Sequence, residues 1–170
     1  MCKRVLAMDL SLNCPAFAVC RVYPNKNKFF IEEVRHVDNK NSKLTHAEKL
    51  KRTADEIEYI CHKYAGAIDY IVREKGFSRF ATTTQALFKV VGVSDLTIYQ
   101  LTGHKAIEEI APTQIKVFVG GYGKATKDEV ENGLRDMLDD SQKDYPFATD
   151  DESDAVGVAL TFCLKNGLLM

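Results

Sequence analysis

The stretch Arg4-Val-Leu-Ala-Met-Asp-Leu-Ser11 is a short apolar run that ends at a polar residue. Such a run is typical of a central β-strand that is buried on both faces. Asp9 lies inside it. An ionised carboxylate in an apolar strand costs several kcal/mol to desolvate unless it is paired or bound to a metal ion. The opening strand therefore predicts both the centre of a sheet and a first candidate functional residue.

Two more apolar stretches follow this strand closely. They cover residues 16–23 and 29–37, and the turn between them is Pro24-Asn-Lys-Asn-Lys28. Short apolar runs separated by turn residues predict strands that pair in sequence order. We therefore expect a meander of three antiparallel strands.

Helix and strand patterns then alternate. The expected elements are a helix from Thr45, a strand over 68–74, a helix over 82–101 that Gly103 ends, a strand over 106–110 and a helix over 112–119. Thr45 and Glu48 fit a capping box, and Glu74 ends its strand. This order predicts an α/β fold with a mixed central sheet of about five strands, three antiparallel and then parallel, flanked by helices.

Two helices close the chain. After the turn Gly120-Gly-Tyr-Gly123, Thr126 and Glu129 fit a second capping box for a helix that reaches about Leu138. A polar segment leads to Asp150-Asp-Glu-Ser-Asp-Ala155, where the last helix begins. Its residues Asp151 and Asp154 are three apart, which places both on one helical face.

Composition sets the broad class. The chain has 170 residues, 45% of them hydrophobic, and a net charge of −1, which is the balance of a single compact domain without a basic excess. Five separated cysteines with no C-x-x-C pair indicate neither a zinc site nor a disulfide framework. No apolar run approaches the ~20 residues of a membrane span. We expect one domain over residues 1–170 in a soluble, cytoplasmic protein.

The placement of the acids indicates a metal site. Asp9 and Glu74 are carried by strands, and Asp151 and Asp154 by a helix start. Clustered carboxylate oxygens suit Mg²⁺ or Mn²⁺. A plainer interpretation exists for each acid. Asp150, Asp151 and Glu152 could instead stabilise the helix N-terminus through its dipole, so the choice of Asp151 as a ligand stays open.

The order strand-Asp, strand-Glu, helix-Asp-x-x-Asp-Ala resembles the RuvC family of Holliday-junction resolvases, within the RNase H-like nucleases. Three segments carry the resemblance across nearly the whole chain: Tyr70-Ile-Val-Arg-Glu-Lys-Gly-Phe77, residues 111–130 around the glycine turn, and Asp151-Glu-Ser-Asp-Ala-Val-Gly-Val-Ala159. The turn Ser11-Leu-Asn-Cys-Pro15 departs from the family because it lacks the usual glycines. Short length and divergent turns are similar to phage-encoded members, which act in the cytoplasm of a bacterial host.

The resemblance implies an RNase H-like fold and a metal-dependent endodeoxyribonuclease. Two Mg²⁺ ions, replaceable by Mn²⁺, would be held by Asp9 as bridging ligand, by Glu74, and by Asp151 and Asp154. The substrate would be branched DNA, above all four-way junctions, cut to 5′-phosphate and 3′-hydroxyl ends. Family members act as homodimers, and the helix over residues 82–101 is the candidate contact because of its apolar surplus.

Four residues are candidates for contacting DNA. Lys116, Lys124 and Lys127 flank the glycine turn, and Lys127 matches a family lysine counted with the catalytic residues. Ammonium groups beside a flexible turn and a helix start suit a phosphate backbone. Phe77 matches the family's aromatic residue beside the junction centre. Solvated lysines and a core phenylalanine are the plainer interpretations.

Other functions fit parts of the pattern. An RNase H-type enzyme that cuts RNA in hybrids would share the acids, and a non-catalytic DNA-binding module could share the fold. An actin- or sugar-kinase-like ATPase starts similarly but needs a second lobe that 170 residues do not allow. Gly120-Gly-Tyr-Gly-Lys-Ala-Thr126 lacks the spacing of a P-loop, so we reject nucleotide binding there.

Overall fold

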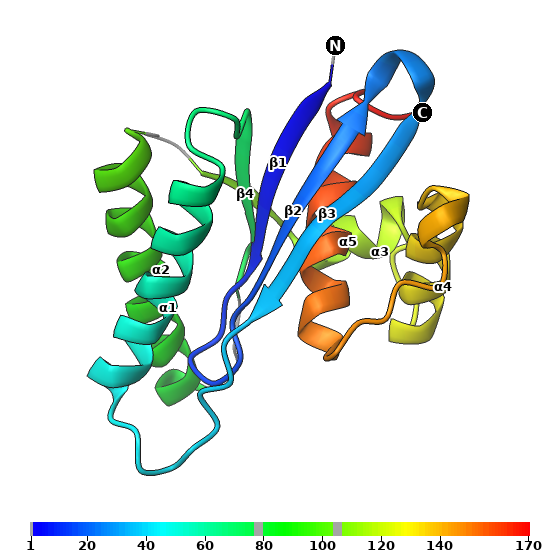
Figure 1. Cartoon of the computed structure of the whole chain (residues 1–170). Coiled ribbons are helices and arrows are strands. Elements are labelled where there is room, and N and C mark those ends of the chain that lie inside the picture. The colour runs from blue at the N-terminus through cyan, green and yellow to red at the C-terminus, as the bar shows by residue number, and fades with distance from the viewer. Residues whose placement is uncertain (1, 77–79, 104–106) are drawn as a thin grey trace.

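A computed structural model describes residues 2–76, 80–103 and 107–170, and its centre is a five-stranded sheet (Figure 1). The strands are β1 (Lys3–Asp9), β2 (Ala16–Tyr23), β3 (Lys28–His36), β4 (Tyr70–Glu74) and β5 (Glu108–Ile110). The helices are α1 (His46–Lys63), α2 (Ala81–Thr102), α3 (Pro112–Phe118), α4 (Lys127–Met137) and α5 (Asp150–Lys165). Short 3₁₀ turns lie at Pro24–Lys26 and Asp140–Gln142.

The sheet order is β3-β2-β1-β4-β5. β1 and β2 pair antiparallel, as do β2 and β3, whereas β4 runs parallel to both β1 and β5. β1 is therefore the central strand, and its residues Val5 to Met8 are fully buried. The predicted mixed sheet of three antiparallel and then parallel strands is confirmed.

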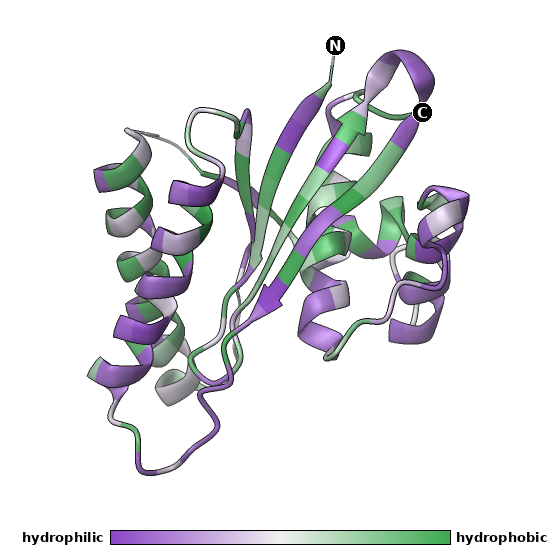
Figure 2. Cartoon of the chain, in the orientation of Figure 1, coloured by the Kyte–Doolittle hydropathy of each residue, from purple (hydrophilic) through white to green (hydrophobic). Residues whose placement is uncertain are grey.

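Helices cover both faces of this sheet. α1 and α2 pack on one face, and α5, with α3 and α4 beside it, packs on the other (Figure 1). Alternate residues of β1 supply the two cores. Val5 and Ala7 face α5, and Leu6 and Met8 face α1 and α2. Figure 2 shows the corresponding apolar inner sides of the helices. A two-faced core explains why β1 is an almost uninterrupted apolar run.

Local signals set most of the helix ends. Thr45 with Glu48 and Thr126 with Glu129 form complete capping boxes, as expected. Gly103 ends α2 with φ +68°, a left-handed conformation that glycine adopts without strain. The last predicted strand is shorter than expected, and part of its expected range lies outside the described residues.

An ion cluster connects α2 to the sheet. The buried Arg73 of β4 hydrogen bonds to Glu109 of β5 at 2.9 and 3.1 Å and pairs with Asp95 of α2. Removing one partner of such a buried pair would leave an uncompensated charge. Within the described part of the chain, no helix combines the length and the hydropathy that a membrane span requires.

Candidate active site

Asp9 and Glu74 meet at one edge of the sheet. β1 and β4 are parallel, and Met8 lies opposite Arg73, so the same register carried one step further brings Asp9 beside Glu74. Both side chains point to the α5 face, because Ala7 and Val72, two residues earlier, lie in the core under α5. Strand parity and parallel pairing thus place two carboxylates at the C-terminal ends of adjacent strands.

The first turn of α5 brings further acids to this edge. Thr149 caps the helix by accepting a hydrogen bond from the backbone N–H of Glu152. Asp151 and Asp154 both act electrostatically on Asp9, as their spacing on one helical face predicted. The structure therefore brings together the four acids that the sequence singled out: Asp9, Glu74, Asp151 and Asp154.

These carboxylates disfavour one another's charge. Burial, together with the charges of Glu74, Asp154 and Asp151, raises the pKa of Asp9 to about 8, although Lys127 opposes this shift. Burial and the neighbouring Asp154 raise the pKa of Glu74 to about 7. The pKa of Asp154 is also raised by burial, although Lys127 opposes this shift. The site therefore carries more acidic groups than it can ionise at neutral pH without added positive charge.

Lys127 supplies some of that positive charge. It is the first residue of α4, and its Nζ lies 3.2 Å from a carboxylate oxygen of Asp154 and 3.2 Å from one of Asp150. The prediction that Lys127 belongs to the site is consistent with this contact. Lys116 is half-buried on α3 and Lys124 is exposed after the glycine turn, and no ion pair among the described residues joins either lysine to the acids. Phe77 lies outside the described residues.

Asp150 and Glu152, the alternatives to Asp151 as a metal ligand, have other partners. The side chain of Asp150 is 78% exposed and pairs with Lys127. Glu152 is buried, lies 2.7 Å from Nδ1 of His36, and accepts a hydrogen bond from the backbone N–H of Ala148 at 2.7 Å. Glu152 is thus committed to fixing the start of α5 against the end of β3. These contacts favour Asp151 over Asp150 and Glu152 as the fourth site acid.

Cys14 is a site residue that the sequence pattern did not indicate. Its thiol is buried, and burial, with the neighbouring Asp151 as the next cause, raises the pKa of the thiol to about 11. The other cysteines of the interior behave as the expected small apolar residues. Only the position of Cys14 in the turn after Asp9 could have suggested its role, and spacing alone does not distinguish that from packing.

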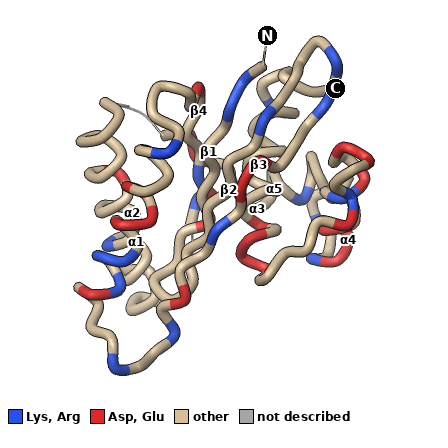
Figure 3. Tube along the Cα trace, viewed as in Figure 1, with Lys and Arg blue, Asp and Glu red and all other residues tan. Residues whose placement is uncertain are grey.

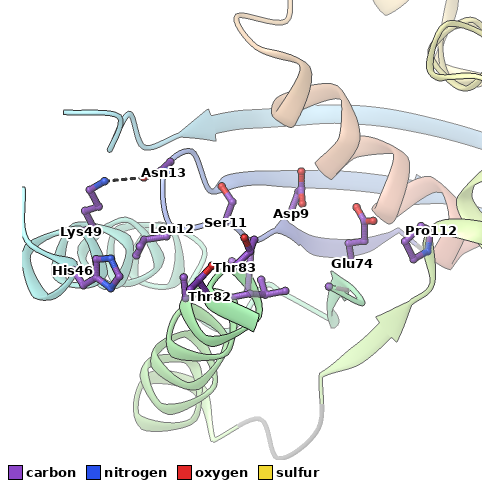
Figure 4. A pocket seen from close by; sticks show the side chains of 14 residues that line it. Asp9, Ser11, Leu12, Asn13, His46, Lys49, Glu74, Thr82, Thr83 and Pro112 are labelled. Atoms are coloured by element: carbon purple, nitrogen blue, oxygen red, sulfur yellow. Dashed lines mark hydrogen bonds between the residues drawn. The ribbon is translucent and has the colours of Figure 1, made fainter. Parts of the chain in front are cut away.

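An open cleft of about 760 Å³ lies beside these acids. Asp9 and Glu74 line one end, and the turn at residues 10–13 lines its wall (Figure 4). The first turns of α1 and α2 complete the other walls through His46, Lys49, Thr82 and Thr83, and Ala86 and Leu87 also line the cleft. We call this space the acid cleft. Its size is that of clefts that bind small molecules or single units of a polymer.

The donor set fits divalent cations. Buried carboxylates that raise one another's pKa values are relieved by bound positive charge, and their oxygens suit Mg²⁺ or Mn²⁺. Within the described residues, no three Asp, Glu, His or Cys side chains are arranged to hold one metal ion as they stand. Cation binding would therefore draw the carboxylates together and compete with Lys127 for Asp154.

Comparisons with known proteins agree with this geometry. A model of the family "Crossover junction endodeoxyribonuclease RuvC" matches residues 5–162. The chain is similar to the RuvC protein of Prochlorococcus marinus strain MIT 9211, with 34% identity over 114 residues that cover 67% of this chain and 68% of the relative. It is 27% identical to RuvC of Thermotoga maritima over 165 residues, covering 96% of this chain and 92% of the relative.

Solved structures show the same fold. The chain is similar to T. thermophilus RuvC in complex with a Holliday-junction substrate, with a TM-score of 0.84 and 18% identity over 98% of this chain and 96% of the other. The predicted RNase H-like fold of the RuvC type is confirmed. The family match extends from β1 through the acids of α5, so it covers every element that carries the site. The chain belongs to the RuvC family of crossover junction endodeoxyribonucleases.

Proposed function

We propose that this protein is a structure-selective endonuclease that cuts four-way DNA junctions by phosphodiester hydrolysis, leaving 5′-phosphate and 3′-hydroxyl ends. The observation that carries the proposal is the convergence of Asp9, Glu74, Asp151 and Asp154 beside the acid cleft. Membership of the RuvC family supplies the substrate class. Carboxylates gathered from two strands and a helix serve no evident packing purpose, because their mutual repulsion destabilises the fold.

Two divalent cations, Mg²⁺ or Mn²⁺ in its place, would be held by these four carboxylates, Asp9, Glu74, Asp151 and Asp154. When bound, such cations make water nucleophilic at neutral pH and stabilise negative charge on the leaving 3′ oxygen. The protein's own part is to hold the ligands in place. Glu152 with His36 fixes the first turn of α5 relative to the sheet. Rigid support of this kind keeps ligand positions within the narrow tolerance that catalysis needs.

Lysines around the site would bind the DNA backbone. Lys127 reaches Asp154 and offsets the charge of the acids next to an incoming phosphate. Lys124 and Lys116, before the same helix, would contact phosphates further along the strand. Phe77 stays a predicted contact to an unpaired base. Figure 3 shows acidic and basic residues interspersed over the chain, so these local groups matter more than the net charge of −1.

A homodimer would match the two-fold symmetry of a junction, and α2 is its candidate contact. Part of the apolar surplus of this helix is core, since Leu87 and Val90 pack against the sheet. Phe88, Leu96 and Tyr99 remain 64%, 57% and 55% exposed along the same helix. Exposed apolar side chains grouped in this way mark contact surfaces.

Sedimentation analysis tests the dimer. Leu96→Glu should convert a dimer to monomers, whereas Met137→Glu, at an exposed apolar position on α4, should leave the assembly unchanged. A wild-type protein that stays monomeric at all concentrations would refute this part of the proposal.

One substrate panel tests the activity. A labelled four-way junction, a matched duplex and an RNA–DNA hybrid are incubated with the protein and Mg²⁺ or Mn²⁺. We expect cleavage of the junction by the wild type and by Asp150→Asn, and none by Asp154→Asn. A junction left intact with both metals would refute the proposal. Preferential cleavage of the hybrid would favour an RNase H-type enzyme, and binding without cleavage a non-catalytic module.

The cell compartment follows from the substrate. An enzyme of this activity would work where bacterial DNA lies, in the cytoplasm of a cell or of a phage-infected host. The origin of the gene in a phage stays a prediction, as do any helicase partners.

A further inference from the structure

Lys49 is a buried cation without an anionic partner in the described structure. It lies on α1 with 8% of its surface exposed, and its side chain lines the acid cleft. Its Nζ donates a hydrogen bond to Oδ1 of Asn13 at 2.7 Å. None of the ion pairs formed among residues 2–76, 80–103 and 107–170 includes it. An ammonium has three donors, and a buried charge without a counter-charge is costly.

Several more exposed lysines of this protein have the carboxylate partner that Lys49 lacks. Lys3, Lys28, Lys63 and Lys165 are more exposed than Lys49, yet each lies within 2.9 Å of a carboxylate. Lys127, at the acids, has two carboxylate partners. A buried lysine whose nearest partner is a neutral amide is therefore unusual within this chain. This position indicates that an anion binds the Lys49 ammonium when the protein holds its substrate.

The acid cleft extends from the Lys49 ammonium to the acids. Asp9 and Glu74 lie at one end, and Lys49 with Asn13 lies beyond Ser11 at the other, as Figure 4 shows. Thr82 and Thr83, in the first turn of α2, line the same space. Hydroxyls and backbone N–H groups at the start of a helix favour phosphate groups.

We propose that Lys49 binds a backbone phosphate of the DNA strand that is being cut, one that flanks the phosphodiester positioned at the acids. This inference rests on the proposed function. An ammonium is a point charge that binds phosphate oxygens without reading the base, so the contact would position the strand and carry no sequence preference. Lys49 is thus a positioning residue, held apart from the acids by the length of the cleft.

A purely structural role for Lys49 is the competing explanation. Its contact with Asn13 supports the turn after β1, but that turn has another support. The buried Asn39 donates to the backbone carbonyls of Leu12 and of Lys49, and its N–H donates to the carbonyl of Asn13. Because Asn39 holds the turn through backbone atoms, loss of the Lys49 ammonium should leave the turn in place.

The experiment pairs Lys49→Met with junctions that carry one neutral methylphosphonate at a time along the cut strand. Lys51→Met, at an exposed position on the same helix, is the matched control. In the wild type, one flanking methylphosphonate should raise KM about 10-fold with little change in kcat, as expected for one lost charged contact. In Lys49→Met the same methylphosphonate should cause no further rise in KM. For Lys49→Met, the slope of the logarithm of the binding constant against the logarithm of the salt concentration should also fall in magnitude by about 0.9.

Two further variants separate phosphate binding from support of the turn. Asn13→Ala removes the structural contact and should keep the methylphosphonate effect, and Lys49→Arg should restore KM. The inference is overturned if no phosphate position shows an effect that depends on Lys49, or if Asn13→Ala abolishes that effect as fully as Lys49→Met does. A wild type that neither binds nor cuts the unmodified junction would instead refute the proposed function.

Discussion

Replacing Asp9 by Asn should stabilise the cation-free protein. In the unfolded chain this carboxyl ionises near its ordinary pKa of 3.8, whereas in the folded protein burial and the neighbouring acids raise its pKa to about 8. The unfolded state therefore releases the proton more readily. Ionisation of Asp9 favours unfolding increasingly as pH rises from about 4, and the effect becomes constant above about 8.

The magnitude follows from this difference. At pH 7 the pH lies about 3 units above the pKa of Asp9 in the unfolded chain but below its pKa in the folded protein. At about 1.4 kcal/mol per unit, this sets an upper limit of roughly 4 kcal/mol on the loss of stability that Asp9 causes. Rearrangement of the neighbouring acids reduces this energy, so we expect Asp9→Asn to raise the free energy of unfolding by about 2–4 kcal/mol. For a chain of this length that corresponds to an increase in Tm of roughly 5–10 °C.

Thermal unfolding in EDTA between pH 4 and 9 measures the effect. The gain should be absent near pH 4, grow with pH and level off above 8. Saturating Mg²⁺ should reduce or invert it, because bound cations stabilise the wild type more than the variant. Asp55→Asn, at an exposed position on α1, should change stability by less than about 0.5 kcal/mol. An Asp9→Asn protein less stable than wild type in EDTA at pH 8, or a gain independent of pH, would refute the reasoning.

Four other predictions concern rate and stability. Lys127→Met should lower the cleavage rate about 10²-fold while the circular dichroism spectrum stays unchanged, because its ammonium contacts Asp154; an unchanged rate would remove it from the site. His36→Ala should cost about 2 kcal/mol in urea unfolding by removing the side-chain partner of the buried Glu152, and His36→Gln should recover part of this loss. Gly133→Ala should cost about 3 kcal/mol, since an added Cβ would lie 1.9 Å from the carbonyl oxygen of Val119. Gly157→Ala should be neutral or stabilising, because its added Cβ would make only an ordinary contact with Ile115 at 3.7 Å, and equal effects of the two substitutions would contradict this packing. The whole chain should unfold in one calorimetric transition, as a single domain does, and two resolved transitions would exclude that.

Much of the fold could be predicted because its signals are local. The capping boxes at Thr45 and Thr126 join atoms three residues apart, and the left-handed Gly103 ends α2 by its own conformational freedom. The apolar run around Asp9 predicted a central strand because only a strand covered on both faces tolerates such a sequence. The observed boundaries differ from the predicted ones by a residue or two, as element ends commonly do.

The candidate site was predictable in its residue types but not in its contacts. Asp9, Glu74 and Asp154 stand out by position within their elements, and the structure gathers them at one edge of the sheet. The spacing from Asp154 favoured Asp151, but it left Asp150 and Glu152 as alternatives. Their environments differ only after folding, when Glu152 pairs with a residue 116 positions away.

By itself, the sequence determined the strands, the helices, their order and the family to which the chain belongs, because hydrophobic periodicity and caps act over a few neighbouring residues. The tertiary structure decided which acids share a site, how strongly they repel, and that Lys49 lies buried at the far end of the acid cleft with no carboxylate partner among the described residues. These properties depend on which strands become neighbours and on how much water is excluded. Both arise only when β1, β4 and α5 pack together, since desolvation and the interaction of charges distant in sequence exist only in the folded chain.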